Sequence, residues 1–325
     1  MSSVTPHRSD NDGPQPHLVI ESADDDGILM LAYLPDGRRV VSGAYDGTVR
    51  VLNLEDGKQE GTSMKHASYI SDLAVTRDGT KIICSDGDGE TKVWDVKSHG
   101  IVKQWTHPEG GPIAISPDDR LLAVGGKTVA VYTMEGRQVN HSIKVDGYVD
   151  SLCFSPNGKK LACGTIDDIR VYDVDSGTLL SESQQKWAHC VLWSRDGSRL
   201  FSGSIDNTIR CCNSDTGEQI GHPWTGHTIA IRSLSLSPDG SILASASLDR
   251  TVRFWDATTG HPIGHLQHDK AVDAVRFSPS GEFVVSGGWD RKIYLWGVPW
   301  LNSVENRVRA LTRCTSVFIL IALSI

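Results

Sequence analysis

Short runs of alternating apolar and polar residues recur between Ile28 and Trp296, and turn residues separate them. Alternation with a period of two is typical of strands that bury one face. The clearest runs continue into a Ser-Pro-x-Gly turn, as in 151–160, 233–242 and 274–283. Proline fixes φ and glycine tolerates positive φ, so this element favours a tight turn between strands. The body shows no helical spacing, which predicts an all-β chain.

One phrase recurs seven times at a spacing of about forty residues, the signature of a repeat architecture. It has small residues, an aspartate in most copies, and an alternating run that most often ends on an aromatic side chain. The final position of the phrase is Leu52, Trp94, Tyr132, Tyr172, Cys212, Trp255 and Trp296. Each unit predicts four antiparallel strands, and such sheets must pack face to face around an axis to bury both faces.

The repeats resemble the WD-repeat β-propeller family over roughly 28–296. Units open with Gly226-His227 in the best copy, and they end with Trp94-Asp95 and Trp255-Asp256. Departures from this pattern occur at Leu52-Asn53, Tyr132-Thr133, Cys212-Asn213 and Trp296-Gly297. The resemblance implies a seven-bladed β-propeller of four-stranded antiparallel blades.

The last unit ends at its third strand, and a short apolar segment lies before the first unit. We predict that an N-terminal strand at 17–21 completes blade 7 and closes the ring, within a propeller that spans 17–301. Closure removes exposed sheet edges that invite aggregation. Trimming residues 1–21 is therefore expected to destabilise the protein, whereas trimming 1–14 is expected to do little.

The two ends of the chain fall outside the repeats. Residues 1–16 are polar and contain proline, which predicts a disordered tail. Residues 302–325 continue no repeat and end in an apolar stretch, 316–325, that is about half the length of a membrane span. A short packed helix, a truncated membrane anchor, and an altered or incomplete chain end remain the alternatives, of which we favour the last.

Composition narrows the class of partner. Hydrophobic residues make up 39% of the 325 residues and the formal net charge is −8, most of it in the first 27 residues. A body close to neutral argues against binding nucleic acid or anionic membranes through basic patches. Seven cysteines without a C-x-x-C pair, and no signal-like N-terminus, favour the cytoplasm, the nucleus or both.

The resemblance implies a structural hydrogen-bond tetrad of histidine, serine, aspartate and tryptophan in several blades. The candidates are His66, Ser85, Asp88 and Trp94; His227, Ser245 or Ser247, Asp249 and Trp255; and His268, Ser286, Asp290 and Trp296. Serine, histidine and aspartate could also form a nucleophilic triad. We reject that interpretation because enzymes do not repeat a triad in every blade.

Other chemical motifs are weak. His261, His265 and His268 have the spacing of a zinc-binding helix, but proline and glycine interrupt the segment. The Gly126-Lys127-Thr128 run lacks the first glycine of a phosphate loop. We therefore expect no catalytic residues, no metal and no cofactor.

The resemblance also implies that partners dock on the rim of one propeller face, at three positions per blade. These positions give Tyr45, Tyr69, Tyr148, Asp150, Ile166, Trp187, Ile205, Arg232, Leu248, Asp273 and Trp289. Five of them are aromatic, as is common at the hot spots of interfaces. Asp150 and Asp273 suggest a partner with a basic anchor residue.

The sequence thus predicts a non-catalytic scaffold that binds proteins or peptides. Two alternatives stay open. A substrate receptor of a ubiquitin ligase would carry a W-D-x-R element, which only 94–97 (WDVK) approaches. An enzyme with its active site at the mouth of the channel would need acids, bases or metal ligands gathered there.

Overall fold

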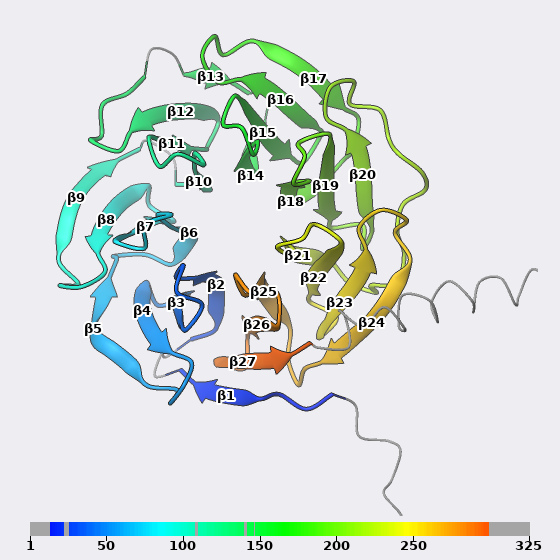
Figure 1. Cartoon of the computed structure of the whole chain (residues 1–325). Coiled ribbons are helices and arrows are strands. Elements are labelled where there is room, and N and C mark those ends of the chain that lie inside the picture. The colour runs from blue at the N-terminus through cyan, green and yellow to red at the C-terminus, as the bar shows by residue number, and fades with distance from the viewer. Residues whose placement is uncertain (1–13, 23–25, 108–109, 140–141, 146, 299–325) are drawn as a thin grey trace, which may run out of the picture.

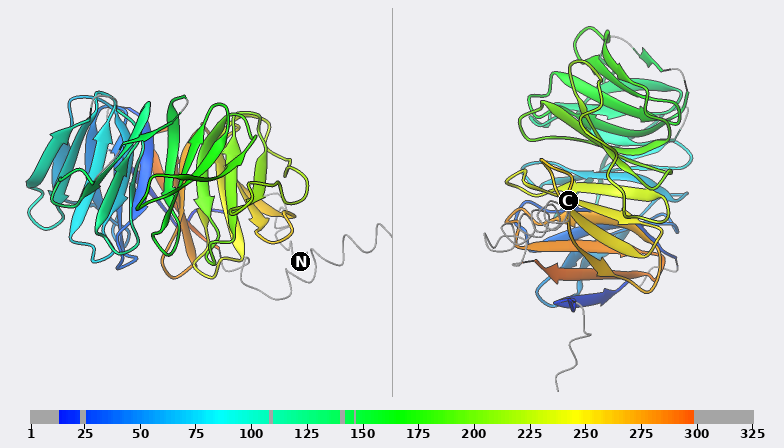
Figure 2. Two further views of the ribbon diagram at one scale, coloured as in Figure 1. Left: turned by 90° about the horizontal axis from the view of Figure 1, so that it is seen from above. Right: turned by 90° about the vertical axis from the view of Figure 1, so that its right-hand side faces the viewer.

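The computed structural model describes residues 14–22, 26–107, 110–139, 142–145 and 147–298. Within them it contains twenty-seven strands in seven antiparallel sheets and no helix. The sheets stand around a central axis like blades, and the ring is a flat disc when seen from the side (Figures 1 and 2). The predicted seven-bladed β-propeller is confirmed. The described residues include no helix long and apolar enough to cross a membrane.

Each blade runs outward from the axis in chain order. Blade 1 comprises β2 (Ile28–Tyr33), β3 (Arg39–Ala44), β4 (Thr48–Asn53) and β5 (Gln59–Lys65). Blade 2 comprises β6 (Ile70–Val75), β7 (Lys81–Asp86), β8 (Glu90–Asp95) and β9 (Ile101–Thr106). Blade 3 comprises β10 (Ile113–Ile115), β11 (Leu121–Val124), β12 (Thr128–Thr133) and β13 (Ile143–Lys144). Blade 4 comprises β14 (Val149–Phe154), β15 (Lys160–Thr165), β16 (Ile169–Asp173) and β17 (Leu179–Ser183).

The remaining blades follow the same plan with two differences. Blade 5 comprises β18 (Ala188–Trp193), β19 (Arg199–Ser204) and β20 (Ile209–Asn213). Blade 6 comprises β21 (Ile231–Leu236), β22 (Ile242–Ser247), β23 (Thr251–Asp256) and β24 (Pro262–Gln267). Blade 7 comprises β25 (Val272–Phe277), β26 (Phe283–Gly288), β27 (Lys292–Gly297) and, from the other end of the chain, β1 (Leu18–Glu21).

The ring is closed by β1, as predicted. β1 pairs antiparallel with β27 from Leu18 opposite Leu295 to Glu21 opposite Lys292. The side chain of Ile20 is buried in a cluster that also contains residues of blades 1 and 7. The first and last described strands therefore share one sheet. The predicted tails lie largely or wholly outside the described residues, at 1–13 and 299–325, and remain expectations.

Blade 5 differs from the expected four strands. Its fourth position holds two isolated bridges, Ile209 to Trp224 and Cys212 to Gln219. The intervening segment contains Pro223, and proline cannot donate to a strand ladder. Trp224 instead packs its buried ring beside Phe201 and Trp255, so this segment fills the gap between blades 5 and 6.

The innermost strand of six blades carries an irregularity at one place. In β14 the pairing moves from Val149–Thr165 to Ser151–Gly164, which leaves Asp150 without an opposing residue. The residues left out in this way are Leu29, Ser71, Asp150, His189, Arg232 and Asp273. A bulge re-aims the extra side chain. These six positions lie at the same end of the propeller, where each innermost strand begins.

Candidate functional site

We define the rim face as the propeller end that carries two kinds of connection. One is the turn between the second and third strands of a blade, and the other is the loop that leads into an innermost strand. Backbone hydrogen bonds join the two, as in Trp289 N to Ala271 O at 3.0 Å and Tyr45 N to Gly27 O at 3.1 Å. All the partner-binding positions predicted from the sequence lie at this end.

Large apolar side chains are exposed on the rim face. They are Tyr45, Tyr69, Tyr148, Ile166, Trp187, Ile205, Ile229 and Trp289. Trp289, at 57% exposure, is the most exposed large hydrophobic residue described. Leu248 is only partly exposed. Sequence reasoning missed Ile229, because the rim position that the repeat gives in this blade falls on its neighbour Ala230, which is buried.

Tyr45 and Tyr69 lie together above blades 1 and 2, with ring centroids 6.4 Å apart. A Cβ atom at Gly87 would come within 2.3 Å of the Tyr69 ring, so only glycine permits this placement. The hydroxyl of Tyr148 donates a hydrogen bond to the carbonyl of Gly110. These contacts fix tyrosine rings that remain exposed to solvent.

Trp187 has a backbone φ of 59°, a value that is unusual for a bulky residue. Its amide donates to Ile166 O at 2.6 Å, and its carbonyl accepts from Ile205 N at 3.2 Å. Nearly half of this side chain is exposed. Strained backbone that presents an aromatic ring to solvent is more common at functional sites than elsewhere.

Charged side chains from the bulges meet at the mouth of the channel. Arg232 Nε donates to Asp273 Oδ1 at 3.0 Å, and Arg232 Nη1 donates to His189 Nε2. Burial and the nearby Arg232 lower the pKa of His189 to about 4, so its ring is neutral at pH 7. Burial raises the pKa of Asp273, and Arg232 opposes that rise.

This pairing changes the expectation of a basic anchor. Asp273 is 5% exposed and its carboxylate already binds Arg232, so it does not offer a free charge to a partner. Asp150 is partly exposed and forms no ion pair within 4 Å among the described residues. Of the two aspartates predicted to attract a basic residue, only Asp150 is available.

Blade 6 contains a complete hydrogen-bond tetrad. Trp255 Nε1 donates to Ser245 Oγ at 2.9 Å, Ser245 Oγ lies 2.7 Å from His227 Nε2, and His227 Nδ1 lies 2.8 Å from Asp249 Oδ2. Ser247 instead donates to Ile229 O. Burial alone would raise the pKa of Asp249, but the hydrogen bonds from His227 and Thr251 hold it well below its usual range. Blade 7 repeats part of this arrangement, with Ser286 bonded to both His268 and Trp296.

Blade 2 differs from the tetrad predicted there. The ladder places Cys84 opposite Lys92, where blade 6 places Ser245 opposite Arg253. Ser85 lies one residue further on and bonds to Ser71 Oγ and Gly111 O. In blade 2 the serine position of the tetrad is therefore occupied by Cys84. The prediction that Ser85 occupies it is wrong.

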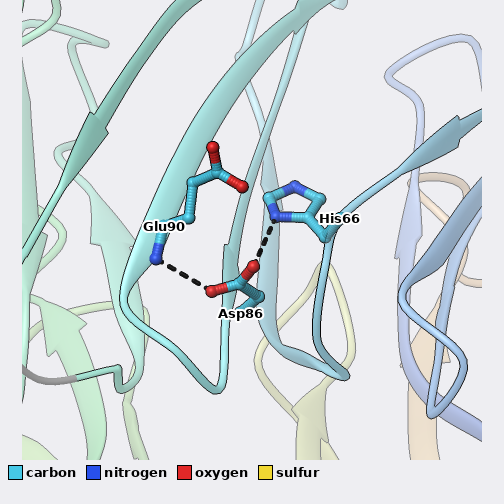
Figure 3. Close-up of side chains that lie close together, drawn as sticks. All are labelled: His66, Asp86 and Glu90. Atoms are coloured by element: carbon cyan, nitrogen blue, oxygen red, sulfur yellow. Dashed lines mark hydrogen bonds and ion pairs between the residues drawn. The ribbon is translucent and has the colours of Figure 1, made fainter.

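The aspartate of blade 2 also differs from the prediction. His66 Nδ1 lies 3.3 Å from Asp86 Oδ2 (Figure 3). The predicted Asp88 is exposed instead. The rings of His66 and Trp94 keep the placement seen in blade 6, with centroids 6.0 Å apart against 6.1 Å for His227 and Trp255. Buried His66 Nε2 and Trp94 Nε1 nevertheless have no hydrogen-bond partner among the described residues.

His66, Asp86 and Glu90 place one potential metal-ligand atom each within 4.8 Å of the others (Figure 3). The ammonium of Lys92 lies 2.8 Å from Glu90 Oε2 and 3.2 Å from the carbonyl of Lys65. The positive charge of Lys92 thus already balances the carboxylate of Glu90, and it would repel a metal ion bound at this cluster. Glu90 therefore forms an ion pair with Lys92.

His268 predicts a pH dependence of stability. Burial lowers its pKa to about 4, against about 6.5 for an unfolded histidine. The unfolded chain therefore binds more protons between these values, so stability is full above about pH 6.5 and falls as the pH drops. We expect the free energy of unfolding to fall by about 1 kcal/mol from this group between pH 7 and pH 5.5. Denaturant unfolding should show a smaller pH-dependent loss in His268→Gln and an unchanged one in His261→Gln, an exposed control.

Comparison with known proteins supports the repeat pattern. The family model described as WD domain, G-beta repeat matches residues 15–53, 57–95, 177–213, 217–256 and 260–297, which together are more than half of the chain. The model of the WD40 domain of anaphase-promoting complex subunit 4 matches residues 113–194. The expected resemblance is thereby confirmed.

Two similar proteins come from Oryza sativa subsp. japonica. Small ribosomal subunit protein RACK1y is 28% identical over 169 residues, which are 47% of this chain and 50% of that protein. Small ribosomal subunit protein RACK1z is 36% identical over 110 residues, 30% of this chain and 33% of that protein. The chain thus spans half or less of the length of these curated relatives.

Proposed function

This chain belongs to the WD-repeat family of β-propeller proteins, and from that premise we propose that it is a non-catalytic scaffold that presents the rim face to protein or peptide partners. One observation carries the proposal. Of the thirteen large hydrophobic side chains that are exposed in the described part of the chain, eight lie on the rim face. The other five lie on the outer strands β1, β9 and β17: Val19, Ile101, Val102, Leu179 and Leu180.

The rim face has the composition of a binding surface. Tryptophan and tyrosine are enriched among the residues that dominate binding energies, and fixed rings lose little conformational entropy when a partner binds. Three rings on the rim face are held in place in this way. They are Tyr69, which packs against Gly87, Tyr148, which bonds to Gly110, and Trp187, whose backbone is strained. A partner that covers these rings needs no rearrangement of the propeller.

We expect an Ile205→Arg, Trp289→Arg variant to lose its partners. Both side chains are more than half exposed, so arginine there should not disturb the core, whereas a buried guanidinium without a counter-ion opposes docking. Affinity purification from native lysate with quantitative mass spectrometry would measure the loss, which we expect to be roughly tenfold or more.

The matched control is Ile101→Arg, Leu179→Arg, which places the same charges on two outer strands. It should retain the partners, and both variants should keep the thermal midpoint of the original protein. Equal recovery of partners by the two variants would locate binding on the blade edges and contradict the proposal.

Association with the small ribosomal subunit is a second candidate, favoured by the names of both rice relatives. With a net charge of −8, such an association would use ribosomal proteins rather than RNA phosphates. It would place the protein in the cytoplasm. Sedimentation of a lysate through a sucrose gradient tests it: co-migration with the small subunit supports this candidate, and recovery only in the light fractions opposes it.

A further inference from the structure

A cavity of about 950 Å³ runs along the propeller axis and is lined by the innermost strands of all seven blades. Its walls combine apolar side chains, including Leu73, Leu152 and Leu234, with a few charged groups. Such a volume and such a lining are typical of sites for small molecules. The charges inside the cavity indicate what kind of molecule fits.

Arg276, on β25, lines this cavity and has no ion-pair partner among the described residues. Its Nη1 atom donates to Ser233 Oγ at 2.7 Å and to Val275 O at 2.8 Å. Its Nε and Nη2 atoms make no hydrogen bond to the described residues, and no described carboxylate lies within 4.0 Å of it. A guanidinium remains charged in proteins, so an unpaired one inside a cavity favours an anion beside it.

Arg232 does not compete for this role. It also lines the cavity, but its guanidinium is bound to Asp273 and His189 at the mouth. Arg195 lines the end of the cavity away from the rim face, two residues after β18 ends at Trp193. Arg276 is the fifth residue of β25, so it lies deeper in the channel than the mouth. At the mouth, Arg232 is paired, whereas Asp150 forms no ion pair with the described residues.

Asp72 restricts the anion further. Its carboxylate lines the same cavity and accepts the amides of Leu73 at 2.7 Å and Ile113 at 2.9 Å, which hold it in place. A nearby negative charge disfavours a dianion such as phosphate more than a singly charged group. A carboxylate accepts two parallel N–H bonds from one guanidinium edge, which the free Nε and Nη2 atoms supply.

We propose that the axial cavity binds a small organic carboxylate, with Arg276 holding the carboxylate group and the leucine-lined walls holding an apolar body. The cavity opens at the rim face, where Tyr45, Tyr69 and Tyr148 belong to its lining. The proposal does not depend on the scaffold function proposed above. A carboxylate that binds the folded protein and not the unfolded chain stabilises the fold.

Isothermal titration calorimetry with phenylacetate and its neutral analogue phenylacetamide tests the proposal. We expect phenylacetate to bind and to raise the thermal midpoint, and phenylacetamide to bind at least tenfold more weakly. Phenyl phosphate, as the dianionic probe, should also bind more weakly than phenylacetate. Equal binding of acid and amide, or no binding of phenylacetate at millimolar concentration, overturns the proposal.

Two variants locate the site. Arg276→Lys keeps the charge but loses the fork of donors, and it should weaken phenylacetate at least tenfold. Arg195→Gln removes the other unpaired arginine of the lining and should leave the affinity unchanged. If Arg276→Lys does not fold, a crystal structure of the original protein with phenylacetate decides: a carboxylate at Arg276 supports the site, and one elsewhere or none overturns it.

Discussion

Deletion of residues 1–21 is expected to lower the midpoint of thermal unfolding by on the order of 10 °C, because it removes β1 from blade 7. Four residue pairs join β1 to β27, and Ile20 is 5% exposed in a cluster with Ile28 and Ile293. Loss of a buried isoleucine alone costs ~2–5 kcal/mol. The deletion also leaves β27 as an open edge, so aggregation should accompany unfolding. Differential scanning calorimetry would measure both effects.

Two controls separate closure of the ring from nonspecific damage. Deletion of residues 1–14 keeps β1 and should leave the midpoint close to that of the full chain. Within β1, Ile20→Asp places a charge in the core and should destabilise strongly, whereas Val19→Asp changes a neighbouring side chain that is 41% exposed. Equal midpoints for the two deletions would show that β1 does not hold the ring together.

Exchange of serine and cysteine is expected to have opposite effects in two blades. Ser245→Cys should lower the free energy of unfolding by about 2 kcal/mol, because the thiol replaces a hydroxyl that bonds to both His227 and Trp255. Cys84→Ser should raise it by about 1–2 kcal/mol, because the hydroxyl reaches the unpartnered His66 Nε2 and Trp94 Nε1. Urea unfolding at pH 7.5 would measure both changes.

Cys163→Ser is the matched control for Cys84→Ser. Cys163 is fully buried and holds the equivalent ladder position in blade 4, opposite Arg170, but Tyr172 replaces the tryptophan there. A new hydroxyl would be buried without the histidine and indole partners, so this variant should be destabilised. A gain of stability in both cysteine variants would mean that the orphaned atoms of blade 2 do not matter.

The arrangement of the blades could be predicted from the sequence because each blade is one copy of the repeat and buries the apolar residues of that copy. The Ser-Pro-x-Gly turn and the run that ends at Trp255 or Trp296 mark strands whose faces are set by a period of two. The outer part of blade 5 could not be predicted, because Pro223 and Trp224 stand where a strand is expected and their effect depends on Phe201 and Trp255. The secondary-structure propensities of these residues do not indicate a contact with side chains on other strands.

The candidate site divides in the same way. Positions on the rim face follow from the repeat, so the exposure of residues such as Trp187 and Trp289 agrees with the sequence expectation. The binding role of these residues stays a prediction. The pairing of Arg232 with Asp273 joins side chains of neighbouring blades that are 41 residues apart, and a residue type alone does not reveal such a partner. Likewise, the predicted Ser85 is only one residue from Cys84, which occupies the tetrad position. Neighbouring residues of a strand face opposite sides of the sheet, so this difference of one residue removes Ser85 from the tetrad.

The bulge in the innermost strands has an evolutionary consequence. Because the extra residue has no opposing neighbour in the ladder, its side chain can change without altering the pairing around it. Six such positions already hold a leucine, a serine, two aspartates, a histidine and an arginine in otherwise similar strands. Selection can therefore change a position such as Asp150, which has no ion-pair partner among the described residues, at little cost to the fold. Arg232, Asp273 and His189 bond to one another, so these three positions are expected to change together.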